Sequence, residues 1–129
     1  AVHITYLGGN EKQILILLKD TLHKDLHAEE RKLLLAILDA IKVKVNDYAL
    51  VFWDKHSTYN FEQFTGFLGA KKVLSFGMNA QTLGLDSLAY NNIHRINEVE
   101  FILTSHLTDL KSDVASKKAF WSQLKVLFP

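Results

Sequence analysis

The sequence predicts a single three-layer α/β domain with a mainly parallel central sheet and helices on both faces. Short apolar runs alternate with amphipathic segments, which is the order expected when strands are joined by helical crossovers. The apolar runs are nearly continuous, as in strands that are covered on both sides. The chain has 129 residues, of which 48% are hydrophobic. Since no repeat or linker divides it, residues 1–129 are expected to form one domain.

The first half of the chain predicts two strands and the helix between them. Residues 13–18 form a continuous apolar run that is typical of a central strand. Residues 28–41 begin with acidic side chains, which favour a helix N-terminus. Three-to-four spacing predicts that this helix buries a stripe of apolar side chains, namely Leu34, Leu35, Leu38 and Ile41. Residues 48–53 then predict the second strand.

A capping box predicts a second, shorter helix. The side chain of Asn60 can accept a hydrogen bond from the backbone of Gln63, while Gln63 reaches back to the backbone of Asn60. Gly69 can end this helix, because glycine adopts the left-handed conformation at helix C-termini. Residues 72–76 then predict the third strand.

The last part of the chain predicts two more strands and a terminal helix. Residues 79–83 are expected to form one or two helical turns. Residues 93–96 and 99–104 predict two strands joined by a short turn. Ser112 or Asp113 can begin the last helix, because both residue types cap helix N-termini.

Composition argues against several functions. A net charge of +1 provides no general attraction to nucleic acid, so any DNA contact is expected to be weak or made through a partner. The chain has no cysteine, which excludes disulfides, thiol catalysis and cysteine-based metal sites. No apolar run approaches the roughly 20 residues of a membrane span, and the N-terminus lacks a signal-peptide pattern. We therefore expect a cytoplasmic protein without a membrane partner.

Polar residues that follow the predicted strands are the candidate functional residues, because ligands bind beyond the carboxyl ends of parallel strands. They are Asp20, His23, Asp54, Lys55, His56, Asn79, Gln81, His106, Thr108 and Asp109. An aspartate and a histidine that converge here could position a water molecule and stabilise negative charge. The more frequent role of such aspartates is to accept hydrogen bonds from backbone amides.

Neither a metal nor a cofactor is expected. His23 and His27 are four residues apart and could bind a metal from one helix face, but no carboxylate motif accompanies them. No P-loop or nucleophile-elbow pattern is present. Phe120 and Trp121 fall in a helical stripe and are predicted to belong to the core rather than to anchor a partner.

Three segments resemble the uracil-DNA-glycosylase superfamily. They are ILILLKDTLH (residues 14–23), VLSFGMNAQ (residues 73–81) and HLTDL (residues 106–110). The resemblance implies that Asp20 corresponds to the family's water-positioning aspartate and His106 to the histidine that stabilises the uracil anion. It also implies that His23 corresponds to the last residue of the family's first motif.

Several residues that this superfamily uses to bind the base are replaced. Other side chains stand where the family has glycine, glutamine, proline and tyrosine, namely Leu18, Lys19, Thr21, Leu22, Leu107 and Asp109. Residues 48–53 also lack the asparagine that recognises uracil. A base-flipping enzyme must pack and hydrogen-bond the extruded base, so these departures argue against catalysis.

The chain is also similar to the psi-subunit family of the bacterial DNA polymerase III clamp-loader assembly, which has a degenerate glycosylase-like fold. The similarity spans about residues 13–124 and is most specific in LTDLKSDVASKKAFWSQL (residues 107–124). It implies a non-catalytic connector in DNA replication that binds the chi subunit and, through an N-terminal tail, the clamp loader. Only residues 1–12 precede the first expected strand here. Asp20, His23 and His106 would then be relics of the fold rather than catalytic residues.

Two other interpretations remain open. One is a divergent uracil-DNA glycosylase, or another glycosylase-fold DNA-repair enzyme, that uses Asp20 and His106. The other is a small-molecule-binding α/β domain. A basic, open groove beside His106 would favour the enzyme, whereas an exposed apolar patch elsewhere would favour the connector.

Overall fold

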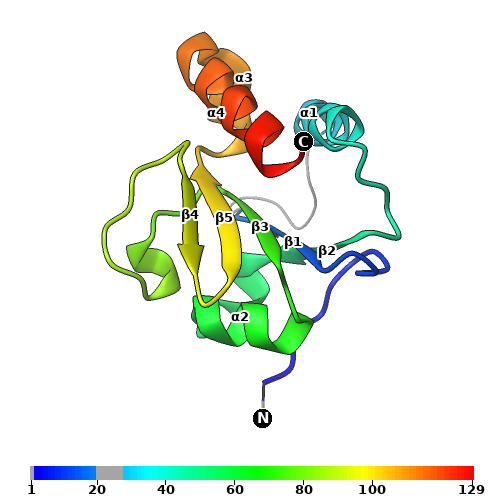
Figure 1. The fold of residues 1–129 in the computed structure, drawn as a ribbon, viewed down its shortest axis with the longest axis vertical. Helices are drawn as coiled ribbons and strands as arrows, with labels where there is room; N and C mark the ends of the chain where they lie inside the picture. Colours follow the sequence, from blue (N-terminus) through cyan, green and yellow to red (C-terminus); the bar gives the residue numbers. More distant parts are fainter. Residues whose placement is uncertain (1, 20–27) are drawn as a thin grey trace.

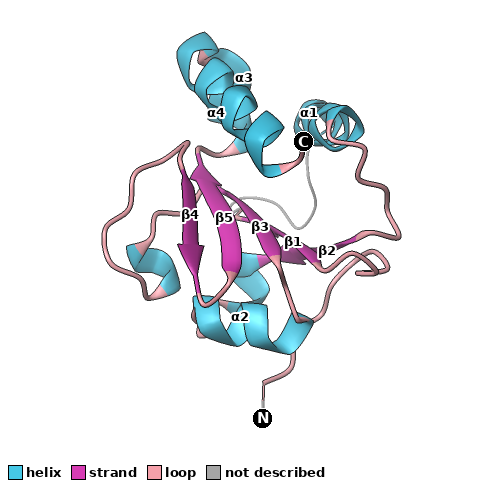
Figure 2. Cartoon of the chain, viewed as in Figure 1, coloured by secondary structure: helices cyan, strands magenta, loops and turns pink. Residues whose placement is uncertain are grey.

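A computed structural model describes residues 2–19 and 28–129 of the chain (Figure 1). The predictions for Asp20, His23 and His27 therefore lie outside the described residues. The described part has the predicted α/β architecture, with a mainly parallel sheet and helices on both of its faces (Figure 2). No helix among the described residues is long and apolar enough to cross a membrane.

The described residues form a five-stranded sheet in the order β2-β1-β3-β5-β4. Its strands are β1 (Ile14–Leu18), β2 (Tyr48–Phe52), β3 (Lys72–Phe76), β4 (Ile93–Ile96) and β5 (Val99–Thr104). The first four strands in that order pair in parallel, and β4 pairs antiparallel to β5. In the register, Ile14 lies beside Tyr48 on one side and Lys72 on the other. The prediction that residues 13–18 contain a central strand is thus confirmed.

Helices pack against both faces of this sheet. They are α1 (Ala28–Ala40), α2 (Phe61–Leu68), α3 (Leu107–Ser112) and α4 (Val114–Leu127), with two 3₁₀ turns, η1 (Trp53–His56) and η2 (Gln81–Leu83). Leu15 and Leu17 of β1 belong to the core cluster under α2. Ile14, Ile16 and Leu18 belong to the cluster under α1, α3 and α4. Because side chains alternate between faces along a strand, this double coverage explains the continuous apolar run.

The predicted apolar stripe of α1 is partly wrong. Leu34 and Leu38 are buried as expected, and Ile37 is buried with them. Leu35 is 54% exposed. Ile41 lies just beyond the end of the helix but still packs, partly buried, against the core cluster under α1, α3 and α4. Positions three and four residues after Leu34 share its face, whereas the next residue along the chain is rotated away from it. Packing against the sheet therefore buries the face of α1 that is centred on Ile37.

The ends of β1 and β2 also differ slightly from the prediction. Gln13 precedes β1 and adopts a positive φ of 56°, while its carbonyl oxygen accepts a hydrogen bond from the Lys71 amide. Trp53 does not continue β2 but begins η1. A single turn therefore starts at the carboxyl end of the edge strand.

Residues 7–10 form a strap along the free edge of β2. Leu7 and Leu50 exchange two backbone hydrogen bonds of 2.9 and 2.8 Å. The amides of Gly9 and Asn10 donate to backbone carbonyl oxygens on or just before β2. The strap satisfies backbone groups that an uncovered edge strand would expose for pairing with another chain.

Local sequence signals set the ends of α2 and the turn before β5. The reciprocal hydrogen bonds between Asn60 and Gln63 confirm the capping box, and Gly69 ends α2 at a φ of 63°. Asn97 and Glu98 both have positive φ, of 50° and 68°, between β4 and β5. Two successive residues of positive φ give a turn whose twist matches that of an antiparallel hairpin.

Candidate functional site

The carboxyl ends of β1, β3 and β5 lie side by side. Backbone hydrogen bonds continue past these strands, because the Lys19 amide donates to Phe76 over 3.1 Å and the Gly77 amide donates to Thr104 over 3.0 Å. His106 follows on the same edge. Lys19, Gly77 and His106 therefore lie together at this edge, and His106 is the only one of the three that the sequence named as a candidate.

His106 begins helix α3. Its Nδ1 atom accepts a hydrogen bond of 3.2 Å from the Thr108 amide, so the side chain caps the helix. A ring nitrogen that accepts carries no proton, and the neutral ring must therefore hold its proton on Nε2. The segment TSHLTDL (residues 104–110) thus ends strand β5 and starts helix α3.

Glu30 is the functional candidate that the sequence analysis missed. It lies on α1, is 5% exposed, and its Oε2 atom lies 3.9 Å from Nε2 of His106. This oxygen has no hydrogen-bond partner among the described residues. Glu30 precedes Leu34 by four residues, so it lies on the buried face of α1. This four-residue spacing was the signal in the sequence that could have identified Glu30 as buried. Glu30 was instead interpreted only as an acid that favours the helix N-terminus.

Lys19 and Gly77 flank His106. The Nζ atom of Lys19 lies 5.3 Å from the ring centre of Trp53, a cation–π arrangement. Gly77 has a φ of 89°, and a Cβ there would lie 3.2 Å from the His106 ring and 3.5 Å from Lys19 Cβ. Glycine therefore permits the close approach of this turn to both side chains.

The other sequence candidates do not join this cluster. Asn79 accepts hydrogen bonds of 2.9 and 2.8 Å from the amide and hydroxyl of Thr82, and so organises η2. Lys55 lies over the ring of Phe52, 5.6 Å away. Apart from His56, the remaining four are surface residues, namely Asp54, Gln81, Thr108 and Asp109. Local hydrogen bonds, or exposure to solvent, account for the polar side chains at these positions.

His56 connects η1 to the N-terminal segment instead. Its Nε2 atom accepts a hydrogen bond of 3.1 Å from the Thr5 amide, and its ring stacks on Tyr59. The Tyr59 hydroxyl accepts a further hydrogen bond from the His3 amide. Partial burial lowers the pKa of His56 from its usual 6.5, and the charges of His3 and Lys55 lower it further. The folded protein thus favours the neutral ring.

We expect the His56 interaction to weaken in acid. Because its folded pKa lies below the unfolded value of 6.5, its stabilisation is complete above that pH and is lost as the pH falls through the folded pKa. An NMR titration should show the His56 ring changing at a midpoint below 6.5, with the Thr5 amide following it. A midpoint at or above 6.5, or an unresponsive Thr5 amide, would contradict this account.

The buried carboxylate of Glu30 faces the Nε2 atom of His106 at 3.9 Å, which is longer than a hydrogen bond. The same imidazole already holds the first turn of α3. No group of three or more His, Asp or Glu residues within residues 2–19 and 28–129 is placed to hold a metal ion.

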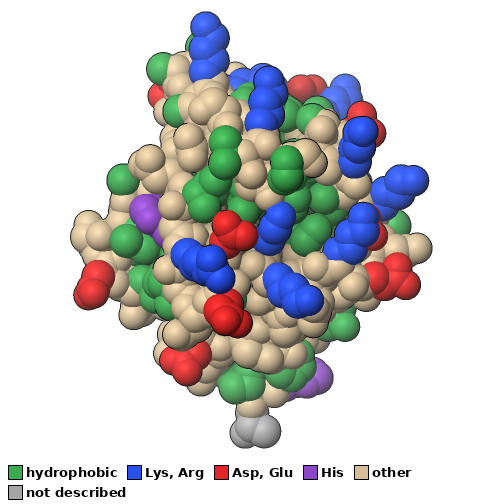
Figure 3. Space-filling model, in the orientation of Figure 1, with side chains coloured by type: hydrophobic (Ala, Val, Ile, Leu, Met, Phe, Trp, Pro, Cys, Tyr) green, Lys and Arg blue, Asp and Glu red, His purple; other side chains and the backbone are tan. Residues whose placement is uncertain are grey.

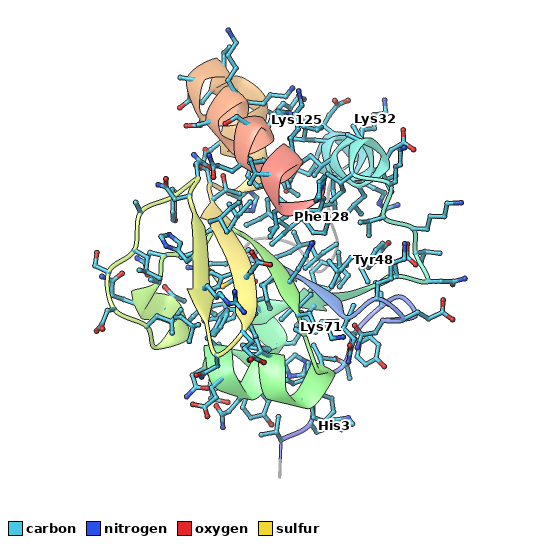
Figure 4. All side chains as sticks on the ribbon, in the orientation of Figure 1. His3, Lys32, Tyr48, Lys71, Lys125 and Phe128 are labelled. Carbon is cyan, nitrogen blue, oxygen red and sulfur yellow. The ribbon has the colours of Figure 1, made fainter. Side chains whose placement is uncertain are left out.

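An apolar surface lies between helix α1 and the edge strand β2. We define the edge patch as Leu7, Leu35, Val45 and Tyr48. Its three aliphatic side chains are 59%, 54% and 58% exposed, respectively. Two hollows of about 570 and 220 Å³ adjoin it and share Leu35, Leu38 and Tyr48 as lining residues. Figure 4 places Tyr48 at this edge, near α1.

No protein-family model matches the chain, and no curated protein sequence matches it significantly. The class that the structure defines is an α/β domain with a mostly parallel five-stranded sheet within its described residues.

Proposed function

We propose that this chain is a non-catalytic, psi-like accessory subunit of the DNA polymerase III holoenzyme with a uracil-DNA-glycosylase-like fold. Its role is to connect a chi-like subunit and single-strand-binding protein to the clamp loader through protein–protein contacts. The observation that carries the proposal is the edge patch, because three large aliphatic side chains there are more than half exposed. Clustered exposed apolar residues mark interaction sites on soluble proteins.

The composition of the edge patch suits a protein partner. Its aliphatic centre is bordered by Arg31, Asp39 and Lys44, which line the adjoining hollows. An apolar centre with a charged rim is the usual arrangement of a protein interface. The rim can orient a partner, while burial of the centre supplies most of the affinity.

The contacts that His106 and Lys19 make within the chain also support a connector. Nδ1 of His106 is used to cap α3, and Nε2 is oriented towards Glu30. Lys19 stands where the glycosylase resemblance has its base-reading glutamine, and its Nζ atom lies over Trp53. These contacts stabilise the fold and do not require a bound base.

One observation favours a second candidate function, a divergent uracil-DNA glycosylase. The buried carboxylate of Glu30 lies beside the partly exposed imidazole of His106 at the carboxyl ends of the strands, where α/β enzymes place their catalytic groups. This candidate would use Asp20 and His106. Its reaction, the excision of uracil from DNA, can be assayed directly.

We expect Leu35→Asp to weaken partner capture at least about 30-fold, the scale of a 2 kcal/mol interface hot spot. The full chain would be used to capture proteins from a lysate of its own cells, and affinity for the recovered partner would be measured by calorimetry. His106→Ala should leave this affinity unchanged. Phe67→Asp is the matched control, because Phe67 is an exposed apolar residue on α2, at the other face of the sheet.

The same preparations would be assayed for uracil excision. Recovery of clamp-loader components without uracil release would support the connector. Uracil release that disappears in Asp20→Asn would overturn it in favour of the glycosylase. Equal capture by wild type and Leu35→Asp would remove the edge patch as the partner site.

A further inference from the structure

We propose that the exposed face of α4 binds a short acidic segment of a partner protein, one that also carries a large apolar side chain. The inference rests on the proposed connector function for its biological role, and it names the chemistry of a second partner at a surface separate from the edge patch. We define the α4 groove as Val114, Lys117, Lys118, Trp121, Ser122 and Lys125.

The groove is one continuous stripe along the helix. Its residues follow Val114 at intervals of three, four, seven, eight and eleven positions, which share one face of an α-helix. They surround a hollow of about 600 Å³. Val114 is 66% exposed, and the half-buried Trp121 packs its inner side against the core cluster under α4. The stripe therefore offers an apolar surface to a partner, and the packing of Trp121 against the core holds that surface in place.

The charge of the groove is uncompensated. Helix α4 contains three lysines, Lys117, Lys118 and Lys125, and no acidic residue. None of the three forms an ion pair with any residue in the described part of the chain. The neighbouring Lys111 is different, because it contacts Glu29 over 3.1 Å. Figure 3 shows Lys and Arg side chains concentrated over the half of the molecule that contains α4 and α1.

Complementarity to this stripe requires acidic and apolar groups together. Carboxylates would satisfy lysines that lack partners within the described chain, and an apolar side chain would cover Val114 and the exposed edge of Trp121. A single strand of nucleic acid also binds lysines and aromatic rings, but it stacks successive bases on successive rings. Trp121 is the only aromatic residue of the groove, because the adjacent Phe120 is buried. These observations favour a peptide.

The test is selection of random peptides displayed on phage by the full-length protein, followed by fluorescence anisotropy of the enriched peptides. We expect enriched sequences to carry aspartate or glutamate around one bulky apolar residue. Lys118→Glu should weaken their binding about tenfold or more, since it replaces an attraction with a repulsion. Val114→Ser should weaken it about threefold through lost apolar contact.

The variants are chosen to keep the helix intact. Val114 and Lys118 are exposed, and glutamate is about as good a helix former as the lysine that it replaces. Lys71→Glu is the matched control, because it makes the same charge change at an exposed position before β3. Figure 4 shows Lys71 well separated from Lys125 of the groove. Peptide binding by this control should match wild type within about twofold.

Absence of acidic peptides from the selection would overturn the inference, as would equal binding by wild type and Lys118→Glu. Oligothymidylate is titrated in parallel. If it binds, loses affinity in Lys118→Glu and no acidic peptide is selected, the groove is a nucleic-acid surface instead.

Leu35→Asp separates this inference from the proposed function, because it should leave peptide binding unchanged. Partner capture through the edge patch without peptide selection would overturn the inference alone. Peptide selection without capture of replication proteins would overturn the proposed function alone.

Discussion

Phe120→Ala is expected to lower the free energy of unfolding by about 3–5 kcal/mol, the usual cost of truncating a buried phenylalanine. Phe120 lies on the buried face of α4, is almost completely buried, and meets Phe76 of β3 edge to face, with ring centres 5.6 Å apart. The truncation would remove this contact and leave a cavity between the helix and the sheet. The loss is large because few neighbouring side chains can fill the space of a ring.

Urea unfolding followed by circular dichroism measures this effect. Val126→Ala is the control, because Val126 lies on the same helix but is exposed. Its effect should stay within about 0.5 kcal/mol, as for most surface substitutions. If Phe120→Ala lowered the free energy of unfolding as little as Val126→Ala does, the buried face of α4 would contribute little to stability.

Gly8→Ala is expected to cost about 2–4 kcal/mol, because backbone strain and overpacking add at one position. Gly8 has a φ of 101°, a conformation that side chains rarely adopt. A Cβ there would also meet the backbone oxygens of Tyr48 and Val45, the latter at 2.8 Å. Backbone cannot move aside as a flexible side chain can. The strap over β2 should therefore detach or distort.

Gly66→Ala provides the opposite control. Gly66 lies within α2, and a Cβ there would meet nothing within 4 Å. Alanine should stabilise the protein by about 0.5–1 kcal/mol, because it favours the helix without a clash. Urea midpoints for the two variants should thus move in opposite directions. A neutral Gly8→Ala would mean that the strap is not held as the structure shows.

The sequence predicted the architecture because its strongest signals are local. Continuous apolar runs located the strands, and the capping box located α2 almost to the residue. The register of α1 on the sheet was harder to predict. Leu34 and Leu35 are both apolar, and only packing against the sheet decides which one is buried.

The candidate site was less predictable than the fold. Position on the carboxyl edge was predicted for His106, whose role as a helix cap could also be inferred from the segment around it. Its proximity to Glu30 depends on how α1 crosses the sheet, which no local pattern encodes. The edge patch and the α4 groove likewise arise from residues that become neighbours only after folding.

The order of the strands also has a consequence for how the chain folds. Two pairs of successive strands are neighbours in the described sheet, β1 with β2 and β4 with β5. Only the second pair is antiparallel and joined by a two-residue turn, at Asn97 and Glu98. Every parallel pair requires a longer loop to close before its hydrogen bonds form. Strand β1 is flanked by β2 and β3, both of which follow it in the chain. Refolding should therefore be slowed by the assembly of this centre, while the β4–β5 hairpin can form early.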